Sequence, residues 1–219
     1  MSMMLQTYWN SRFEAGDIWG TEATPSAVMA YPYFAADQAK QLFVPGCGYG
    51  RNSNFFGEYA FEVTACDISE VAIERASSHA KAVGLANVNH FVGDYLNLPF
   101  PSTERFDGIY LSSILHMYTE EEREQLLAHF TSLLRKDGLL IFSCLSARDE
   151  KLYGAGVEME KDTFLVHDRI AHFFQEEELN ALLEDDYQVV EMTLHKQRVD
   201  FKAGAEQDAQ LWFVVARKK

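Results

Sequence analysis

The stretch QLFVPGCGYGRN, residues 41–52, carries the strongest structural signal in the chain. Its first five residues form a short apolar run that predicts a buried β-strand, and Gly46, Gly48 and Gly50 predict a tight turn after it. A helix is expected from Asn52 to Tyr59, and its first turn would present free backbone N–H groups to a ligand. The stretch therefore predicts a strand–turn–helix unit in which the backbone can approach a bound molecule.

Strands and helices alternate on both sides of this unit. Besides residues 41–45, the residue patterns predict strands at 61–67, 88–93, 106–114, 139–145, 187–195 and 211–217. Helices are expected at 3–14, at 25–36 after the capping residue Thr24, and at 52–59. Three more are expected from the capping residue Ser69 to Gly84, from the capping residue Thr119 to Gly138, and at 176–183. The polar link between the last two strands has no helical pattern, so a hairpin is expected there.

This order predicts an α/β fold, with a doubly wound, Rossmann-like sheet of seven strands whose last strand is antiparallel. We expect a single domain over residues 1–219, with residues 1–38 forming an N-terminal helical cap. Residues 146–174 interrupt the alternation and are expected to form an inserted lid.

Composition narrows the class of protein. Hydrophobic residues make up 47% of the 219 residues and aromatic residues 13%, which is typical of a folded globular domain. The net charge of −14 disfavours nucleic acids and anionic membranes as partners. Three widely spaced cysteines indicate neither a disulfide framework nor a zinc site, and no signal sequence or apolar run of membrane-spanning length is evident. We expect a cytoplasmic monomer or homodimer without a metal ion.

Ligand-binding residues are expected at the carboxyl ends of the strands. Asp67 ends the second strand, where a carboxylate can accept hydrogen bonds from both hydroxyl groups of a ribose. A dinucleotide fingerprint would need a small residue at the position of Arg51, so a nicotinamide-dependent oxidoreductase is disfavoured. Asp94 follows the third strand and could accept the exocyclic amine of an adenine, with Tyr95 or Ile68 packing on the ring. A plain turn or helix cap also explains Asp94.

The glycine turn, the acidic ends of the second and third strands and the expected hairpin resemble the class I S-adenosylmethionine (SAM) dependent methyltransferases. This resemblance implies SAM as the cofactor, with Gly46 and Gly48 near its methionine part, Asp67 at the ribose and Asp94 near the adenine. Ser112 or Ser113 would line the pocket. Cys47 lies inside the turn and is counted with the cofactor-binding residues, although a small filler role also explains it. One departure is Val44, because these enzymes usually carry an acidic residue there.

Two branches of that family resemble the chain further. The turn VPGCG and the opening residues Trp9, Arg12, Phe13, Gly16, Trp19, Gly20 and Pro25 are similar to the thiopurine, thiol and halide methyltransferases. The run GCGYGRNS, the pair Leu194-His195 and the ending ARKK are similar to bacterial tellurite-resistance methyltransferases. Both branches methylate small, polarisable nucleophiles. Trp9, Phe13 and Trp19 are expected to cover the pocket and exclude water.

The resemblance therefore predicts methyl transfer to a small-molecule acceptor with a soft nucleophile, namely a thiol or a selenium or tellurium oxyanion. Such an in-line displacement depends on orientation more than on a strong base. His116 and His195 are the candidate catalytic residues, although a histidine hydrogen-bonded to the backbone equally explains His116. Basic residues of the segments expected to border the pocket could attract an anionic acceptor: Arg148, Lys151, Lys161, Lys196, Arg198 and Lys202.

Two alternatives stay open. A methyltransferase acting on an oxygen or nitrogen of a larger metabolite would need a general base, for which His116 or His195 is available. A SAM-binding sensor or subunit without catalysis would bind the cofactor and turn over no acceptor.

Overall fold

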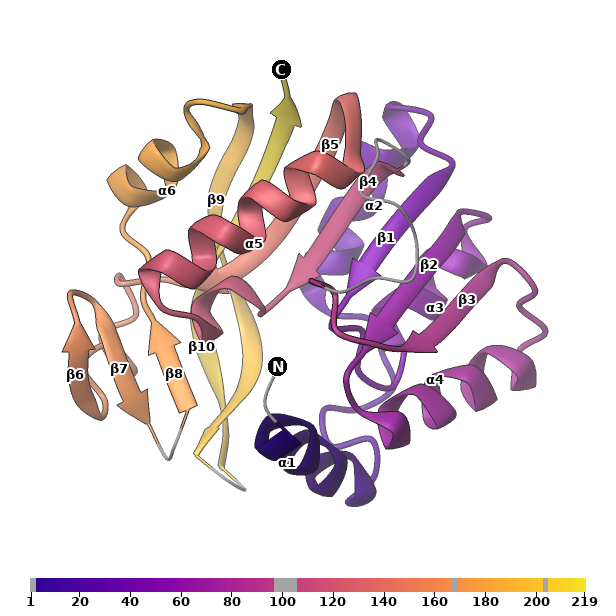
Figure 1. The fold of residues 1–219 in the computed structure, drawn as a ribbon, viewed down its shortest axis with the longest axis horizontal. Coiled ribbons are helices and arrows are strands. Elements are labelled where there is room, and N and C mark those ends of the chain that lie inside the picture. Colours follow the sequence, from indigo (N-terminus) through magenta and orange to yellow (C-terminus); the bar gives the residue numbers. More distant parts are fainter. Residues whose placement is uncertain (1–2, 97–105, 167–168, 203–204) are drawn as a thin grey trace.

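The computed structural model describes residues 3–96, 106–166, 169–202 and 205–219. Seven strands form one sheet in the order β3-β2-β1-β4-β5-β10-β9, in which β10 runs antiparallel to both neighbours (Figure 1). The strands are β1 (Gln41–Pro45), β2 (Glu62–Asp67), β3 (Val88–Val92), β4 (Phe106–Ser112), β5 (Leu134–Leu145), β9 (Tyr187–Lys202) and β10 (Ala205–Lys218). The predicted Rossmann-like sheet of seven strands with an antiparallel last strand is confirmed.

Helices cover both faces of this sheet. They are α1 (Met3–Glu14), α2 (Pro25–Ala36), α3 (Arg51–Glu58), α4 (Glu70–Ala82), the short 3-10 helix η1 (Leu115–Met117), α5 (Glu120–Leu133) and α6 (Glu176–Leu183). Buried side chains of α2, α3 and α4 pack on one face, while those of α5 and α6 pack on the other. Three helices begin at the predicted capping residues, Thr24, Ser69 and Thr119.

The carboxyl-terminal half of strand β5 is apolar except at Ser143, and helices cover both of its faces. Leu139 and Ile141 pack with α2 and α3, whereas Leu140, Phe142 and Cys144 pack with α5 and α6. Successive side chains of a strand point to opposite faces, so a strand covered on both faces carries a nearly continuous run of apolar residues.

The fifth predicted helix ends earlier than its sequence pattern indicated. Helix α5 stops at Leu133, and the chain continues directly as strand, with Leu134 in register with Phe106 of β4. Arg135 Nε donates a hydrogen bond to Oδ1 of Asp107 at 2.6 Å. Pairing with β4 therefore determines this helix end, and a pattern read along one segment does not contain that information.

Residues 146–174, expected as a lid, contain a second, three-stranded antiparallel sheet. Its strands are β6 (Val157–Glu160), β7 (Thr163–Val166) and β8 (Arg169–His172). Buried residues of β7 and β8 pack against Ala209 and Leu211 of β10. Strands β9 and β10 are longer than predicted, because they continue through most of the expected polar link (Figure 1).

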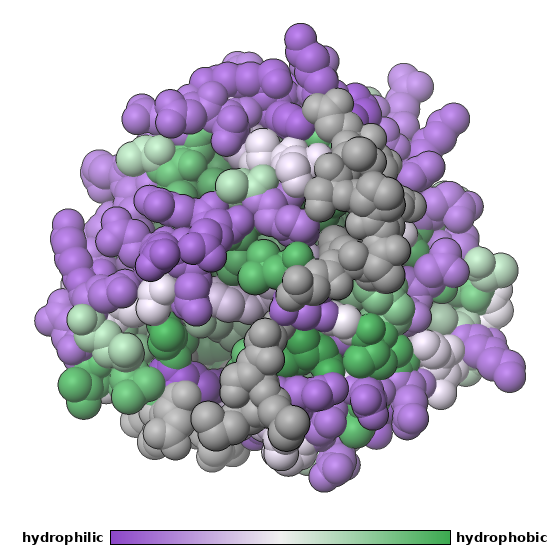
Figure 2. All heavy atoms as spheres, in the orientation of Figure 1, coloured by the Kyte–Doolittle hydropathy of each residue, from purple (hydrophilic) through white to green (hydrophobic). Residues whose placement is uncertain are grey.

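The face of the molecule drawn in Figure 2 is mainly hydrophilic, with smaller apolar patches between the polar side chains. Apolar side chains that remain exposed include Val157 and Met159 of β6 and Leu165 of β7. Within the described residues, no helix has both the length and the apolar composition needed to cross a membrane.

Candidate active site

The glycine turn joins β1 to α3 through a backbone that most side chains would obstruct. Gly46, Gly48 and Gly50 have φ angles of 59°, 55° and 89°, in the left-handed region that glycine adopts at no steric cost. A Cβ atom on Gly46 would lie 2.8 Å from Cδ1 of Ile114, and one on Gly50 would lie 2.8 Å from Cβ of Ala76. The turn therefore lets α3 pack close to α4 and brings its own backbone to the exit of β4.

Asp67 ends β2 beside this turn and connects the two strand exits. Its Oδ2 accepts a hydrogen bond from the backbone N–H of Gly48 at 2.9 Å, and its Oδ1 accepts one from Ser69 N at 2.9 Å. Burial raises the pKa of the carboxyl group, and the backbone donors offset part of that shift. Each oxygen keeps a lone pair for a ligand hydroxyl, which suits the predicted ribose role.

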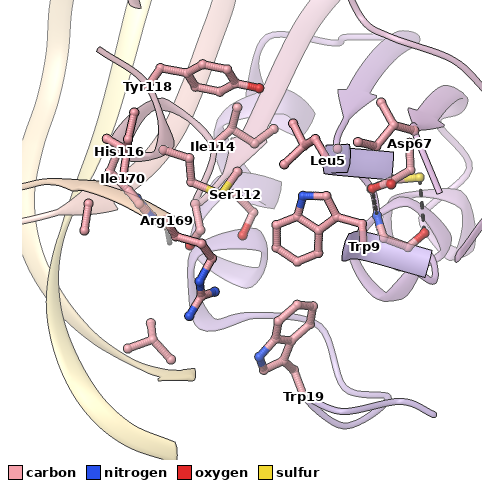
Figure 3. A pocket seen from close by; sticks show the side chains of 18 of the residues that line it. Leu5, Trp9, Trp19, Asp67, Ser112, Ile114, His116, Tyr118, Arg169 and Ile170 are labelled. Carbon is pink, nitrogen blue, oxygen red and sulfur yellow. Dashed lines mark hydrogen bonds between the residues drawn. The ribbon is translucent and has the colours of Figure 1, made fainter. Parts of the chain in front are cut away.

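A cavity of about 440 Å³ opens in front of the turn. Its lining comes from the turn, the ends of β2 and β4, helix η1, helix α1, and strands β8 and β9. Figure 3 shows Asp67 on one side of the cavity, with His116 and Arg169 on the opposite side and Trp9 and Ser112 between them. We call these two parts the Asp67 end and the His116 end.

Aromatic side chains cover the cavity from the N-terminal segment. The rings of Trp9 and Phe13 stack with centroids 5.8 Å apart, and those of Trp19 and Tyr49 stack at 6.2 Å. The Tyr49 hydroxyl accepts a hydrogen bond from Trp19 N at 2.9 Å and donates one to Gly20 O at 2.8 Å. Trp9, Phe13 and Trp19 line the cavity. Their exclusion of water stays a prediction.

Helix α1 and the loop after it are fastened to the rest of the domain by polar contacts. Gln6 Nε2 donates to Ile68 O at 3.1 Å, next to the carboxyl end of β2. The Ser69 hydroxyl donates to Asn10 Oδ1 at 2.7 Å. Asp17 pairs with Arg75 of α4 at 2.8 Å. The cover is therefore held in place by the segments that also position Asp67.

The His116 end combines an uncharged histidine with basic neighbours. Burial lowers the pKa of His116 to about 3, and electrostatic interactions with His172 and Arg169 add to this shift. Its Nδ1 atom is enclosed and has no hydrogen-bond partner within the described residues. Burial also raises the pKa of Tyr118, and the negative charges of Asp94 and Glu122 raise it further. At neutral pH both groups are uncharged.

Most of the predicted site residues are brought together around this cavity. Those that line it are Trp19, Gly46, Cys47, Gly48, Asp67, Ile68, Tyr95, Ser112, Ser113 and His116. Asp94 and His195 do not line it. Asp94 Oδ1 accepts a hydrogen bond from Leu96 N at 3.0 Å, in the turn geometry that was its alternative explanation. His195 lies on β9 with its ring 6.3 Å from that of Phe213, and burial lowers its pKa. The roles of these residues stay predictions.

The basic residues at the cavity differ from the expected set. Arg198 lines it, whereas Arg148, Lys151, Lys161 and Lys196 do not, and the side chain of Lys202 lies outside the described part. Arg169, Asn52 and Gln197 line it and were not predicted. Asn52 lies two residues after Gly50 of the glycine turn, so its position was a usable signal. The sequence contains no signal for Arg169 or Gln197. Arg169 lies in residues 146–174, which have no clear pattern, and Gln197 lies in the part of β9 beyond its predicted end.

The volume and the lining of the cavity suit the cofactor that the sequence resemblance implies. The volume lies within the range of about 300–1,000 Å³ that is usual for small-molecule sites. The glycine turn offers open backbone, Asp67 offers a buried carboxylate, and the aromatic rings suit a purine and a sulfonium cation. These features fit SAM. Within the described residues, no three His, Cys, Asp or Glu side chains gather as metal ligands would.

Comparisons with known proteins agree with this geometry. Residues 45–138 match the family model described as a methyltransferase domain. A thiopurine S-methyltransferase from Gluconobacter oxydans is 24% identical over 140 residues, which span 58% of this chain and 64% of that relative. The chain thus matches a little under two thirds of that relative's length.

Two solved structures have a similar fold. The Burkholderia thailandensis 1,6-didemethyltoxoflavin-N1-methyltransferase with bound S-adenosylhomocysteine has a TM-score of 0.71 and 23% identity, covering 98% of this chain and 87% of its own. TehB from Haemophilus influenzae has a TM-score of 0.69 and 17% identity, covering 96% of this chain and 67% of its own. Residues 45–138 thus match a methyltransferase domain, and the fold of the chain is similar to that of a solved methyltransferase.

Proposed function

We propose that the protein transfers the methyl group of SAM to a small, soft nucleophile, such as a thiol or a selenium or tellurium oxyanion. The relatives named thiopurine S-methyltransferase support an acceptor of this kind, although their identity to the chain is near 24%. The resemblances of the glycine turn and of the opening aromatic residues support the same class of acceptor.

The observation that carries the proposal is the weakness of the bases in the described lining of the His116 end. With a pKa of about 3, His116 is a poor proton acceptor at neutral pH. Burial holds Tyr118 in its neutral form. Glu122 Oε2 already accepts hydrogen bonds from Thr119 N and Oγ1, both at 3.0 Å. An alcohol or an unactivated amide would need a stronger base, whereas a thiol ionises near neutral pH by itself.

The chain's own residues would act mainly by binding and orientation. Asp67 would hold the ribose, the backbone of Gly46 and Gly48 would border the methionine part, and Tyr95 with Ile68 would pack on the adenine. Bound SAM supplies a methyl group already activated on a sulfonium sulfur, so orientation of a good nucleophile supplies much of the catalysis. Trp9 and Trp19 would exclude water from that centre.

A turnover assay tests this function. The purified protein is incubated with methyl-labelled SAM and thiols, halides, selenite, tellurite, alcohols and amines, and both volatile and dissolved products are recovered. Labelled thioether or volatile methylated chalcogen is expected. Label found only on oxygen or nitrogen would contradict the soft-nucleophile assignment, and tight SAM binding without transfer to any acceptor would favour the sensor alternative.

The assay has a matched pair of variants. Asp67→Asn, in the cavity, is expected to lower transfer at limiting SAM. Asp107→Asn changes a carboxylate that also accepts backbone N–H bonds, from Lys40 and Gln41, but does not line the cavity. It should leave transfer near the wild-type rate.

A further inference from the structure

A buried cluster of hydroxyl groups lies between α2 and β4. The Tyr110 hydroxyl is 2.8 Å from Ser26 Oγ and 3.0 Å from Thr24 Oγ1, and these two atoms are 3.1 Å apart. All three side chains are almost completely buried. Buried hydroxyl groups direct their hydrogens at specific acceptors, so such a cluster can fix the orientation of polar side chains around it.

Two side-chain amides complete this cluster. Asn52 Oδ1 accepts hydrogen bonds from Thr24 N at 2.9 Å and Thr24 Oγ1 at 3.1 Å. Gln197 Oε1 accepts one from Ser26 Oγ at 3.1 Å. Since both amide oxygens are engaged, the NH₂ groups are the parts of Asn52 and Gln197 left for other partners.

These amides lie in the cavity wall. Asn52 is 7% exposed and Gln197 is 5% exposed, and both line the cavity. Neither NH₂ group has a hydrogen-bond partner within the described residues, whereas both amide oxygens do. Neither amide nitrogen is among the fully enclosed side-chain atoms that lack a partner, so each NH₂ group is open to the cavity. This arrangement is therefore suited to a ligand that supplies acceptor oxygens.

Gln197 is accompanied by positive charge. Arg198, the next residue of β9, is exposed at the cavity, and Arg169 of β8 projects into it (Figure 3). The charge of Arg169 also acts on His116, where it contributes to the lowered pKa of that histidine. Amide and guanidinium N–H groups together form the donor set that proteins use for carboxylates and other oxyanions.

We propose that Gln197, Arg169 and Arg198 form a subsite for anionic oxygen atoms at the His116 end, and that the methyl acceptor carries a carboxylate or a comparable oxyanion. This inference rests on the proposed function and narrows its substrate class. Ser26 is a positioning residue, because its hydroxyl fixes which end of the Gln197 amide faces the ligand. The subsite would offset, locally, the repulsion that a chain of charge −14 exerts on an anion.

Binding measurements test the subsite independently of turnover. The protein is saturated with S-adenosylhomocysteine, so that the cofactor's own carboxylate is already bound, and its affinities for (methylthio)acetate and (methylthio)ethanol are compared by calorimetry. These two ligands are similar in size and differ in charge. Selenite is titrated in parallel as an oxyanion without a carbon skeleton. We expect the carboxylate to bind at least about tenfold more tightly than the alcohol, as charge-assisted hydrogen bonds predict.

Three variants separate charge recognition from general damage. Gln197→Glu keeps the shape and the acceptor for Ser26 but replaces the donor with a negative charge, and Arg169→Gln removes a positive charge. Each is expected to lower affinity for (methylthio)acetate about tenfold and to leave affinity for (methylthio)ethanol within about twofold. Arg148→Gln is the control, since Arg148 pairs with Glu176 and does not line the cavity. It should preserve the selectivity.

Equal affinity of the wild type for the two ligands would overturn the proposal, as would variants that weaken both ligands alike. So would a Gln197→Glu protein whose affinity for S-adenosylhomocysteine drops tenfold while acceptor selectivity is unchanged, because the amide would then serve the cofactor. The binding comparison tests the subsite, and carboxylate selectivity would support it whether or not a thiol is methylated. The turnover assay tests the proposed function, so the two proposals can fail independently.

Discussion

Asp67→Asn is the sharpest test of the Asp67 end, because the substitution keeps the shape of the side chain and removes its charge. The carboxylate accepts hydrogen bonds from Gly48 N and Ser69 N, both at 2.9 Å. An amide has one oxygen, so its NH₂ group must face one of these two donors. One buried N–H then loses its acceptor, which lowers the free energy of unfolding by about 1–3 kcal/mol.

The effect on cofactor binding can be estimated from the same geometry. A hydrogen bond to a charged group contributes about 1.5–3 kcal/mol and one between neutral groups about 0.5–1.5 kcal/mol. Each ribose hydroxyl bound to Asp67 would therefore lose about 1 kcal/mol in the variant. With two hydroxyls the loss is about 2 kcal/mol, or roughly 30-fold in Kd.

Calorimetric titration with S-adenosylhomocysteine near neutral pH measures this loss, and thermal unfolding reports stability in the same samples. Asp107→Asn serves as the matched control, because its Oδ2 accepts backbone N–H bonds from Lys40 and Gln41 at 2.8 Å outside the cavity. It should lower stability without changing Kd. A folded Asp67→Asn protein that binds within about twofold of the wild type would refute the ribose assignment.

Three other outcomes are expected. Because the pKa of His116 is lowered to about 3, the residue stays neutral through the physiological pH range. His116→Gln should therefore leave the shape of the pH profile of kcat/KM unchanged between about pH 6 and 9. A rising limb near pH 6.5 that only the wild type shows would contradict this. Gly46→Ala places a Cβ atom 2.8 Å from Ile114 at a φ of 59°, so it should lower both the melting temperature and the affinity for S-adenosylhomocysteine. The control Gly84→Ala, at a φ of 76° in open space, should lower only the melting temperature. Equal losses of affinity in the two variants would refute the role of the turn. Tyr49→Phe removes the hydroxyl group that holds the loop around Gly20. Loss of these hydrogen bonds should lower the free energy of local opening by about 1 kcal/mol, so amide hydrogen exchange in residues 15–24 should accelerate about five- to tenfold. Unchanged exchange would show that ring packing alone orders the loop.

Much of the fold was predictable because local signals and tertiary packing agree. Thr24, Ser69 and Thr119 begin helices where their hydrogen-bonding side chains indicated. The end of α5 at Leu133 was not predictable, since it depends on pairing between Leu134 and Phe106 from another strand. A residue pattern reflects the local preferences of one segment, and it contains no information about which other strand that segment pairs with.

The Asp67 end of the cavity was determined by the sequence itself. The turn needs glycine at its positive φ angles, and a ribose site needs an acidic residue at the end of the neighbouring strand. Both features are visible in the sequence of residues 41–67. Parallel strands place their carboxyl ends at one edge of the sheet, so these residues meet whatever the rest of the chain does.

The His116 end was decided only by the tertiary structure. Ser26 orients Gln197 across 171 positions of sequence, and Arg169 arrives on a small sheet that packs against the extended hairpin. No local pattern marks such residues, because an amide or a guanidinium on a strand has the same sequence signature whether it faces solvent or a cavity. Which side chains face this end of the cavity depends on how far β9 and β10 extend and on what packs against them. These contacts exist only in the folded chain.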